Sequence, residues 1–392
     1  LHSITMAAAR AGNSLLAPAQ VVGGARVFEV DYSGEAKVGT CRDMCPPEER
    51  EKRGSESLKG ADQAQIFEVV PGTRDCDYDR MVSKFQRPTP GYNPLAKDIR
   101  RILTLMKTTQ YLWQNVLMAE KDYSKRYLYL FDRTRQVRQE LSMQGDKGME
   151  SIYISEQIAR FFIFSYHTMC EEADWKAQHK QQNEEQLGKC LITLKACYNK
   201  RRLHALQTGD HSGLEHEEEF LSYLLIMYAC QKDAFQISTF LASVPDSVVN
   251  GKQFRFALDV HSALSTRDME KFRRLFQSSN YLQACLLLRG IEGFRRLAAL
   301  MLGRTFKPSA NFSTEEFCEY FILENEEEAC SFAEHFGIGF GRTEDGIRFE
   351  TTRIGVGTEL RESSMKVFPL KRMPNLLEGR LLAGKSLLKV VV

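Results

Sequence analysis

The chain has 392 residues, of which 43% are hydrophobic and 27% are charged. This composition excludes a wholly disordered chain, because there are enough apolar side chains to fill a core. The 53 Lys and Arg residues nearly balance the 51 Asp and Glu residues, which excludes a strong overall field for nucleic acid or membrane. No apolar run approaches the length that a membrane span needs. At about 150 residues per domain, the length predicts two or three domains or one long array.

The N-terminal part of the chain lacks a sustained hydrophobic period. Residues 1–38 are rich in Gly, Ala and Val, and we predict a disordered tail. Because the chain begins with Leu1, we interpret it as a fragment or as a translated leader with Met6 as the initiator. Residues 39–93 mix charge runs with prolines, which predicts an extended arm rather than a domain.

The arm contains the segment GTCRDMCPPEER at residues 39–50. A zinc site needs four ligands, and this pair of cysteines has neither a second pair nor a nearby His, so we predict no metal. The cysteine spacing also differs from that of a redox pair. We interpret the segment as a short motif whose Cys and Met side chains pack into a groove. The residues assigned to partner binding are Cys41, Arg42, Asp43, Met44, Cys45, Pro46, Glu49 and Arg50.

From Pro94 to about Phe306, apolar residues recur every three or four positions, which is typical of amphipathic helices. Short connections favour antiparallel pairs stacked as a superhelix, so we predict a mainly α helical-repeat domain over 94–306. The helix around 151–172 is apolar nearly all round and should be central. The expected helices span 94–119, 121–142, 150–176, 183–206, 215–230, 233–242, 252–264, 267–277 and 280–303, and no stretch before 307 is predicted to be a strand.

After Pro308 the pattern changes to two helices followed by a hairpin. Ser313 and Glu316 predict a capping box, and a second helix should run from about Glu326 to Gly337. An Asp-Gly turn between alternating apolar runs then predicts a hairpin. Helix, helix and hairpin is the order of a winged helix, which we predict over 307–360. Residues 361–392 are basic, and we expect a tail that is ordered only in part.

One pair of side chains could suggest catalysis. His167 and Cys170 could share a helix face, the minimum for a thiol nucleophile with a base. The surrounding helix is apolar and no oxyanion donor is identifiable, so we predict that both belong to the core. We predict no catalytic residue, no cofactor and no small-molecule substrate.

Charge is distributed unevenly near the C-terminus. Residues 313–350 hold eleven acids and two bases, which is the wrong sign for DNA and favours protein contact by the winged helix. Residues 251–307 hold eleven bases and four acids, which indicates an RNA-binding strip, a site for an acidic protein, or a solvated face. The candidate binding residues are Arg273, Arg274, Arg295 and Arg296, followed by Lys371 and Arg372 of the tail.

Several blocks in succession resemble the Sac-three/GANP family of mRNA-export scaffolds. The first three are the arm motif at 39–50, the block 67–72 (FEVVPG) and the block 132–139 (DRTRQVRQ). Others are His167–Glu172, Asn183–Leu187, Glu218–Phe220 and Ser278–Cys285. The family carries a PCI-type domain, in which stacked helices end in a winged helix. In extent the chain is most similar to the short members that contain only the Sac3 domain. Arg101 stands where many relatives carry proline.

The resemblance implies a non-enzymatic nuclear scaffold, at the nuclear pore or envelope or in the nucleoplasm. Its implied partners are a second PCI-domain protein, a small acidic disordered subunit and RNA. Two alternatives stay open. One is a protein of centrosome duplication or spindle assembly, located at the centrosome or in the cytoplasm, without an RNA role. The other is a scaffold of the proteasome-lid or initiation-factor type.

Overall fold

The computed structural model describes residues 21–22, 25–26, 37–57, 66–73, 75–89, 93–306, 311–344, 346–350, 368–377 and 387–392. The chain divides into two compact units, residues 1–35 and 36–392. In the first unit, strand β1 (Val21–Val22) pairs antiparallel with β2 (Ala25–Arg26). The prediction of no strand before residue 307 is therefore wrong. Strands β1 and β2 were missed because two residues are too few to show a periodic pattern. Most of the predicted tail lies outside the described residues.

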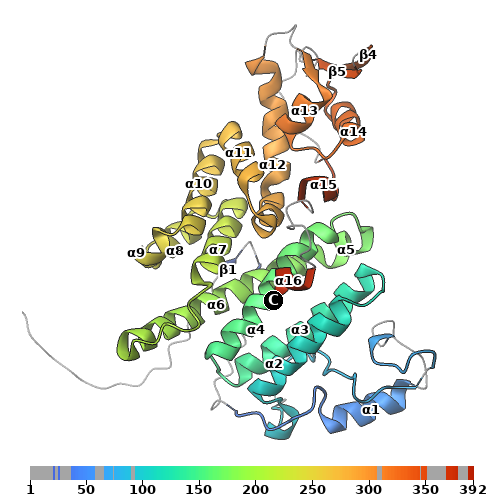
Figure 1. The fold of residues 1–392 in the computed structure, drawn as a ribbon, viewed down its shortest axis with the longest axis vertical. Coiled ribbons are helices and arrows are strands. Elements are labelled where there is room, and N and C mark those ends of the chain that lie inside the picture. Colours follow the sequence, from blue (N-terminus) through green and yellow to red (C-terminus); the bar gives the residue numbers. More distant parts are fainter. Residues whose placement is uncertain are drawn as a thin grey trace, which may run out of the picture. The chain divides into compact units, whose positions relative to one another are not determined.

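The second unit is mainly helical, as predicted (Figure 1). Helix α4 packs against α6, α6 against α7, and α7 against both α10 and α12. These contacts build the predicted stack of helices. The helices of the stack are α2 (Ile102–Tyr111), α3 (Tyr123–Met143), α4 (Met149–Thr168), α5 (Ala173–Gln178), α6 (Lys180–Thr208), α7 (Glu217–Gln231), α8 (Ala234–Leu241), α9 (Asp246–Val249), α10 (Lys252–Thr266), α11 (Met269–Ser278) and α12 (Tyr281–Thr305), with a π-helical turn at Leu112–Leu117.

Two predicted helix boundaries are wrong. The first long helix begins at Ile102 rather than residue 94. A short 3-10 turn at Ala96–Asp98 precedes it, and the chain is then extended at Ile99 and Arg101, where Arg100 forms a parallel bridge with Cys41. The helix expected to reach residue 176 ends at Thr168, and a turn separates it from α5. Apolar periodicity hid this break, since Cys170 in the turn is as buried as the helical residues beside it.

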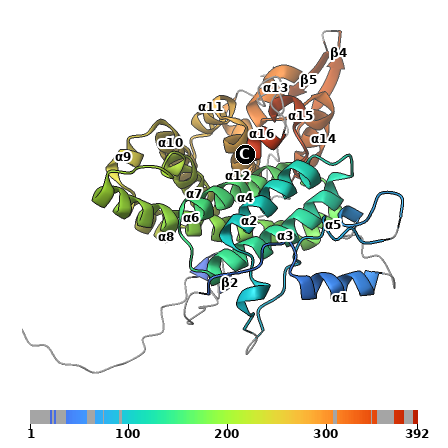
Figure 2. The same ribbon diagram turned by 60° about the horizontal axis from the view of Figure 1, so that its bottom comes forward.

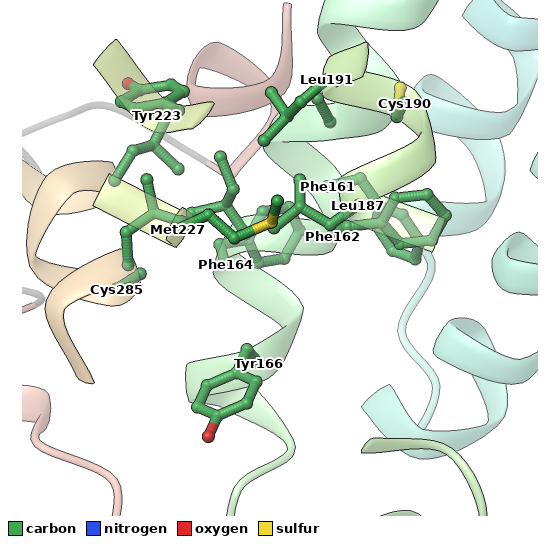
Figure 3. Packing of buried hydrophobic residues seen from close by; sticks show 14 of the residues in the cluster. Phe161, Phe162, Phe164, Tyr166, Leu187, Cys190, Leu191, Tyr223, Met227 and Cys285 are labelled. Atoms are coloured by element: carbon green, nitrogen blue, oxygen red, sulfur yellow. The ribbon is translucent and has the colours of Figure 1, made fainter. Parts of the chain in front are cut away.

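Helix α4 is the centre of the larger core. Phe161, Phe162 and Phe164 are fully buried, in agreement with the apolar character of this helix on all sides. Figure 3 shows them among side chains of α6 and α7, including Leu187 and Met227. Truncating one such phenylalanine to alanine costs about 3–5 kcal/mol. Packing around α4 therefore supplies much of the stability of the stack.

The C-terminal part of the second unit, residues 311–350, is called the C-terminal unit below. It has the element order predicted for a winged helix. It comprises β3 (Asn311–Ser313), α13 (Thr314–Phe321), α14 (Glu326–Phe336), β4 (Phe340–Thr343) and β5 (Gly346–Glu350), with strand order β3-β5-β4. The predicted capping box is present, since Ser313 Oγ accepts from Glu316 N at 3.2 Å and Glu316 Oε2 accepts from Ser313 N at 2.8 Å. Phe317 stacks on Phe349 with ring centroids 4.0 Å apart. The three-residue strand β3 was missed because it is too short to show alternation.

The arm holds one helix, and the described segments of the tail contain two short ones. The arm contains helix α1 (Pro47–Ser57), which lies near α3 in both views (Figures 1 and 2). Its proline suits a first helical turn, and acids at the second and third positions favour the helix dipole. The described parts of the tail form α15 (Pro374–Leu377) and α16 (Leu387–Val391), which pack on α12 and α4. Within the described ranges, no helix has the length and hydrophobicity to cross a membrane.

Candidate partner-binding surface

The arm motif is built into the helical stack by backbone pairing. Cys41 N donates to Ile99 O at 3.0 Å, and Arg101 N donates to Cys41 O at 3.0 Å. Gly39 lies so close to this pairing that an added Cβ would stand 2.5 Å from the carbonyl oxygen of Arg100. Only glycine fits there without displacing backbone.

A buried ion pair holds the same junction. Arg100 and Glu140 are 0% and 1% exposed, and their closest atoms, Nη2 and Oε1, are 2.7 Å apart. Glu140 Oε2 also accepts from the backbone N of Arg100 at 2.8 Å. Arg100 Nη1 reaches back to the carbonyl oxygen of Met44 at 3.2 Å. Because every partner comes from a different segment, the pair joins α3, the start of α2 and the arm motif.

A second buried cluster is centred on Glu68, which is 1% exposed. Its carboxylate accepts from Arg133 Nη2 at 3.0 Å, from Tyr129 Oη at 2.7 Å and from Val82 N at 3.1 Å. It also pairs with Arg53 of α1. The blocks at 67–72 and 132–139, distant in sequence, therefore meet through one carboxylate.

The structure places most of the predicted partner-binding motif against the chain itself. Cys41, Cys45 and Pro46 are buried against the chain itself, and Met44 is half-buried. Glu49 accepts from Ser83 Oγ at 2.6 Å and from Lys84 N at 2.8 Å, so it too is structural. Of the eight assigned residues, Arg42 and Asp43 are exposed, with Arg50 Nη2 3.5 Å from Asp43 Oδ2.

The two thiols of the motif are buried. Burial raises the pKa of Cys45 to about 12, and burial also raises the pKa of Cys41. A thiol with such a pKa stays protonated and is a poor metal ligand or nucleophile at neutral pH. Among the described residues, no group of three or more His, Cys, Asp or Glu side chains could hold a metal ion.

His167 and Cys170 do not form a nucleophile and base. Burial raises the pKa of Cys170 to about 12 and lowers the pKa of His167 to about 4. His167 Nε2 instead accepts a hydrogen bond from the backbone N of Met373 at 2.9 Å. Neither group is poised for proton transfer, in agreement with their predicted place in the core.

The basic strip predicted over 251–307 is divided by the fold. Arg295 is 1% exposed and donates to the carbonyl oxygens of Phe321 and Ile322, at 3.1 and 2.5 Å. Its Nη2 also lies 3.2 Å from Glu328 Oε1. Arg295, predicted to bind RNA or a partner, is therefore buried in this structure, where its guanidinium joins α12 to the C-terminal unit.

The other assigned arginines of the strip have partners or are partly covered. Arg273 pairs with both Glu270 and Glu319, and its side chain is 17% exposed. The side chain of Arg274 is 72% exposed and pairs with Glu270, with 2.7 Å between Nε and Oε1. Arg296 is half-buried. Of the four candidates in the strip, Arg274 is the one that a partner could reach without rearrangement.

Lys371 and Arg372 line a shallow pocket of about 410 Å³ together with four glutamates. Arg372 Nε lies 2.9 Å from Glu171 Oε2, which anchors the C-terminal segment on the turn after α4. The fold thus neutralises one of the two bases. Glu326 and Glu327 are exposed at the start of α14, so the surface of the C-terminal unit is acidic here.

Sequence reasoning missed a cluster around Arg135 in the block at 132–139. The guanidinium of Arg135 lies over the ring of Phe85, 3.9 Å from its centroid, while Arg87 is exposed on the same stretch of the arm. The three arginines of the block are a signal for a charged cluster. Their separate roles become visible only from their contacts with residues that are distant in the sequence. Arg133 is buried on Glu68, whereas Arg138 donates to the side-chain oxygen of Gln186 at 2.8 Å.

Comparison with known proteins identifies the family. The sequence model of the SAC3/GANP family matches residues 44–342. Similar proteins include SAC3 family protein 1 of Schizosaccharomyces pombe (28% identical), Protein xmas of Drosophila melanogaster (26%) and SAC3 family protein B of Arabidopsis thaliana (25%). The alignments cover 77%, 77% and 74% of this chain but only 30%, 15% and 17% of these relatives. The match takes in α1, all of the helical stack and most of the C-terminal unit, and the chain therefore belongs to the SAC3/GANP family.

Proposed function

We propose that the protein is a non-enzymatic scaffold subunit of a nuclear mRNA-export complex. The observation that carries this proposal is the family match over residues 44–342, which spans the stack and most of the C-terminal unit. Stacked helices offer long surfaces on which several partners can assemble.

The C-terminal unit is the proposed contact for a second PCI-domain protein. Glu326, Glu327 and Glu328 occupy the first turn of α14, and the first two are exposed. An acidic first turn repels the phosphates of a nucleic acid but complements a basic protein surface. The negative charge at the start of α14 therefore supports a protein, rather than a nucleic acid, as the partner of the C-terminal unit.

RNA binding is proposed for the exposed part of the basic strip on α10 and α11. Lys252, Arg255, Arg267 and Arg274 are exposed there, whereas Arg295 is not. Phosphate contacts by such residues give an affinity that falls steeply with salt concentration. An acidic subunit could occupy the same strip, and competition between the two is measurable.

The test is purification of the tagged protein from its own cells in low salt, with mass spectrometry of co-eluting chains and an assay of the eluate for RNA. A second PCI-domain protein, a small acidic subunit and bound RNA are the expected result. Centrosomal proteins without RNA, or proteasome-lid or initiation-factor subunits, would overturn the proposal. The charge-reversal variant Arg274→Glu should lower RNA recovery, and Lys176→Glu, an exposed lysine on α5, is the matched control.

A further inference from the structure

Arg135 of α3 is held in place without a polar partner. Its guanidinium carbon lies 3.9 Å from the ring centroid of Phe85 and 5.5 Å from that of Phe131. Stacking on an aromatic face orients the planar fork of an arginine. Within the described part of the chain, Arg135 has no hydrogen bond or salt bridge, and none of its nitrogens is a buried unpaired atom. Its donors are therefore oriented and open to solvent.

The ring that holds Arg135 is itself fixed. The backbone N of Phe85 donates to Asp132 Oδ2 at 3.1 Å, and the next backbone N, of Gln86, donates to Gln136 Oε1 at 3.2 Å. These two bonds tie the end of the arm to α3 directly beside Arg135. The stack is thus part of the docked arm and not a chance contact of a loose side chain.

Positive charge predominates around the stack. Burial is the main cause that lowers the pKa of Arg135, the Asp132 carboxylate is the largest charge effect and raises it, and the neighbouring Arg138 and Arg87 lower it. Asp132 and Glu185 act in the opposite direction, but Asp132 already pairs with Arg133 and Glu185 accepts from Gln181 at 3.0 Å. An anion at the open donors of Arg135 would relieve the repulsion among the three arginines.

Arg133 and Arg135 belong to the same block but differ in their partners. Two residues earlier, Arg133 is 1% exposed and its guanidinium binds Glu68. Arg135 has the same chemistry and a defined position on Phe85, but among the described residues no carboxylate lies within salt-bridge distance of it. We propose that Arg135, with Arg87 beside it, is an anchor for a carboxylate of an acidic segment in a partner protein.

The surroundings favour a protein carboxylate over RNA. A nucleic-acid strand gains affinity from a row of phosphate contacts along a basic groove. Here the cations are confined to one turn of α3 and the end of the arm, and two acids flank them. A single bidentate contact between a guanidinium and a carboxylate suits so small a site. The inference rests on the proposed function only in taking the chain to be an assembly subunit.

The experiment measures binding of a fluorescein-labelled peptide of alternating glutamate and glycine to the full chain by anisotropy in low salt. Arg135→Gln should weaken binding about tenfold, the effect of losing about 1.4 kcal/mol. Arg135→Lys keeps the charge but loses the fork, so it should also bind more weakly than the wild type. Lys176→Gln, which changes an exposed lysine on α5 outside the basic strip, is the matched control and should leave binding unchanged. Unfolding midpoints of all three variants establish that each is folded.

Equal peptide affinity of the wild type and Arg135→Gln would overturn the site. Loss of oligouridine RNA binding in Arg135→Gln with unchanged peptide binding would also overturn it, in favour of a phosphate site. The proposed function has a separate readout, because co-purification of a PCI-domain partner does not depend on Arg135. If export-complex partners co-purify but Arg135→Gln binds the peptide as tightly as the wild type, the anchor is refuted and the proposed function stands. If Arg135→Gln weakens peptide binding but no export-complex partner co-purifies, the proposed function is refuted and the anchor stands.

Discussion

His167 Nε2 accepts a hydrogen bond from the backbone N of Met373 at 2.9 Å, across 206 residues of sequence. The imidazole is 1% exposed, and Met373 is fully buried. Beside this bond, Glu171 accepts from the backbone N and Nε of Arg372 at 3.1 and 2.9 Å. The end of α4 therefore fixes the C-terminal segment through a neutral histidine and an ion pair.

The first prediction concerns acid sensitivity. Burial, aided by Arg372 and opposed by Glu171, lowers the pKa of His167 from 6.5 to about 4. The unfolded chain therefore binds more protons between these values, so the free energy of unfolding should fall as the pH drops from about 7 to about 4, by up to about 3 kcal/mol. His167→Gln retains an acceptor but does not titrate, and urea unfolding at pH 7, 6 and 5 should show a smaller loss. His211→Gln, on an exposed loop, should behave as the wild type, and equal pH profiles of all three would contradict the account.

The second prediction concerns Cys170. Because burial keeps its thiol protonated, Cys170→Ser should leave partner binding intact and alter only stability. Thiol-labelling kinetics on the folded chain should show slow modification of Cys45 and Cys170 and faster modification of the half-buried Cys76. Rapid labelling of Cys170, or loss of activity with the fold retained, would reopen the question of a reactive thiol.

The third prediction concerns the pair of Arg100 and Glu140. Arg100→Met leaves the buried carboxylate uncompensated and should cost about 3–5 kcal/mol of unfolding free energy. The double variant with Glu140→Leu should recover much of this loss, because two apolar side chains can replace a buried pair. Urea denaturation measures both. The control is Lys97→Met, which removes a solvent-exposed pair with Glu48 and should leave the free energy of unfolding nearly unchanged. Equal costs for the two single variants would refute the structural role of the buried pair.

The fourth prediction concerns Gly39. Alanine there would place Cβ 2.5 Å from one backbone oxygen and 2.6 Å from another, so Gly39→Ala should displace the arm motif. Hydrogen exchange at the amides of Cys41 and Arg101, which are bonded in the wild type, should accelerate. Gly293→Ala is the contrasting change, because its Cβ would meet nothing within 4 Å inside α12. That variant should gain about 0.5–1 kcal/mol. Unchanged exchange in Gly39→Ala would show that the arm pairs differently.

The fifth prediction concerns Arg295. Arg295→Glu should destabilise the C-terminal unit, because it places a carboxylate beside Glu328 and removes donors from two buried carbonyls. Circular dichroism melting should show this loss for Arg295→Glu and not for Arg274→Glu. If Arg295→Glu kept its stability but bound RNA more weakly, Arg295 would instead belong to the RNA-binding strip.

Local features of the fold could be predicted from the sequence because they depend on neighbours in the chain. The three-to-four-residue period defines α3, α6, α7 and α10 to within a few residues, and the capping box at Ser313 depends on a residue three positions away. The same reasoning failed for the start of α2, where pairing with Cys41 keeps Arg100 extended. The hydrophobic period of a segment does not depend on such contacts with distant residues, so it cannot predict them.

Composition and motif order determined by themselves that this is a folded, mainly helical chain of the family that its blocks resemble. Only the tertiary structure decided which charged residues reach solvent. Arg100, Arg133 and Arg295 are buried on carboxylates or carbonyls that distant segments supply, whereas Arg135 is left open on Phe85. All four are arginines, and three of them lie in helices. Their roles differ because desolvation of a guanidinium is tolerated only where the fold brings a partner to it.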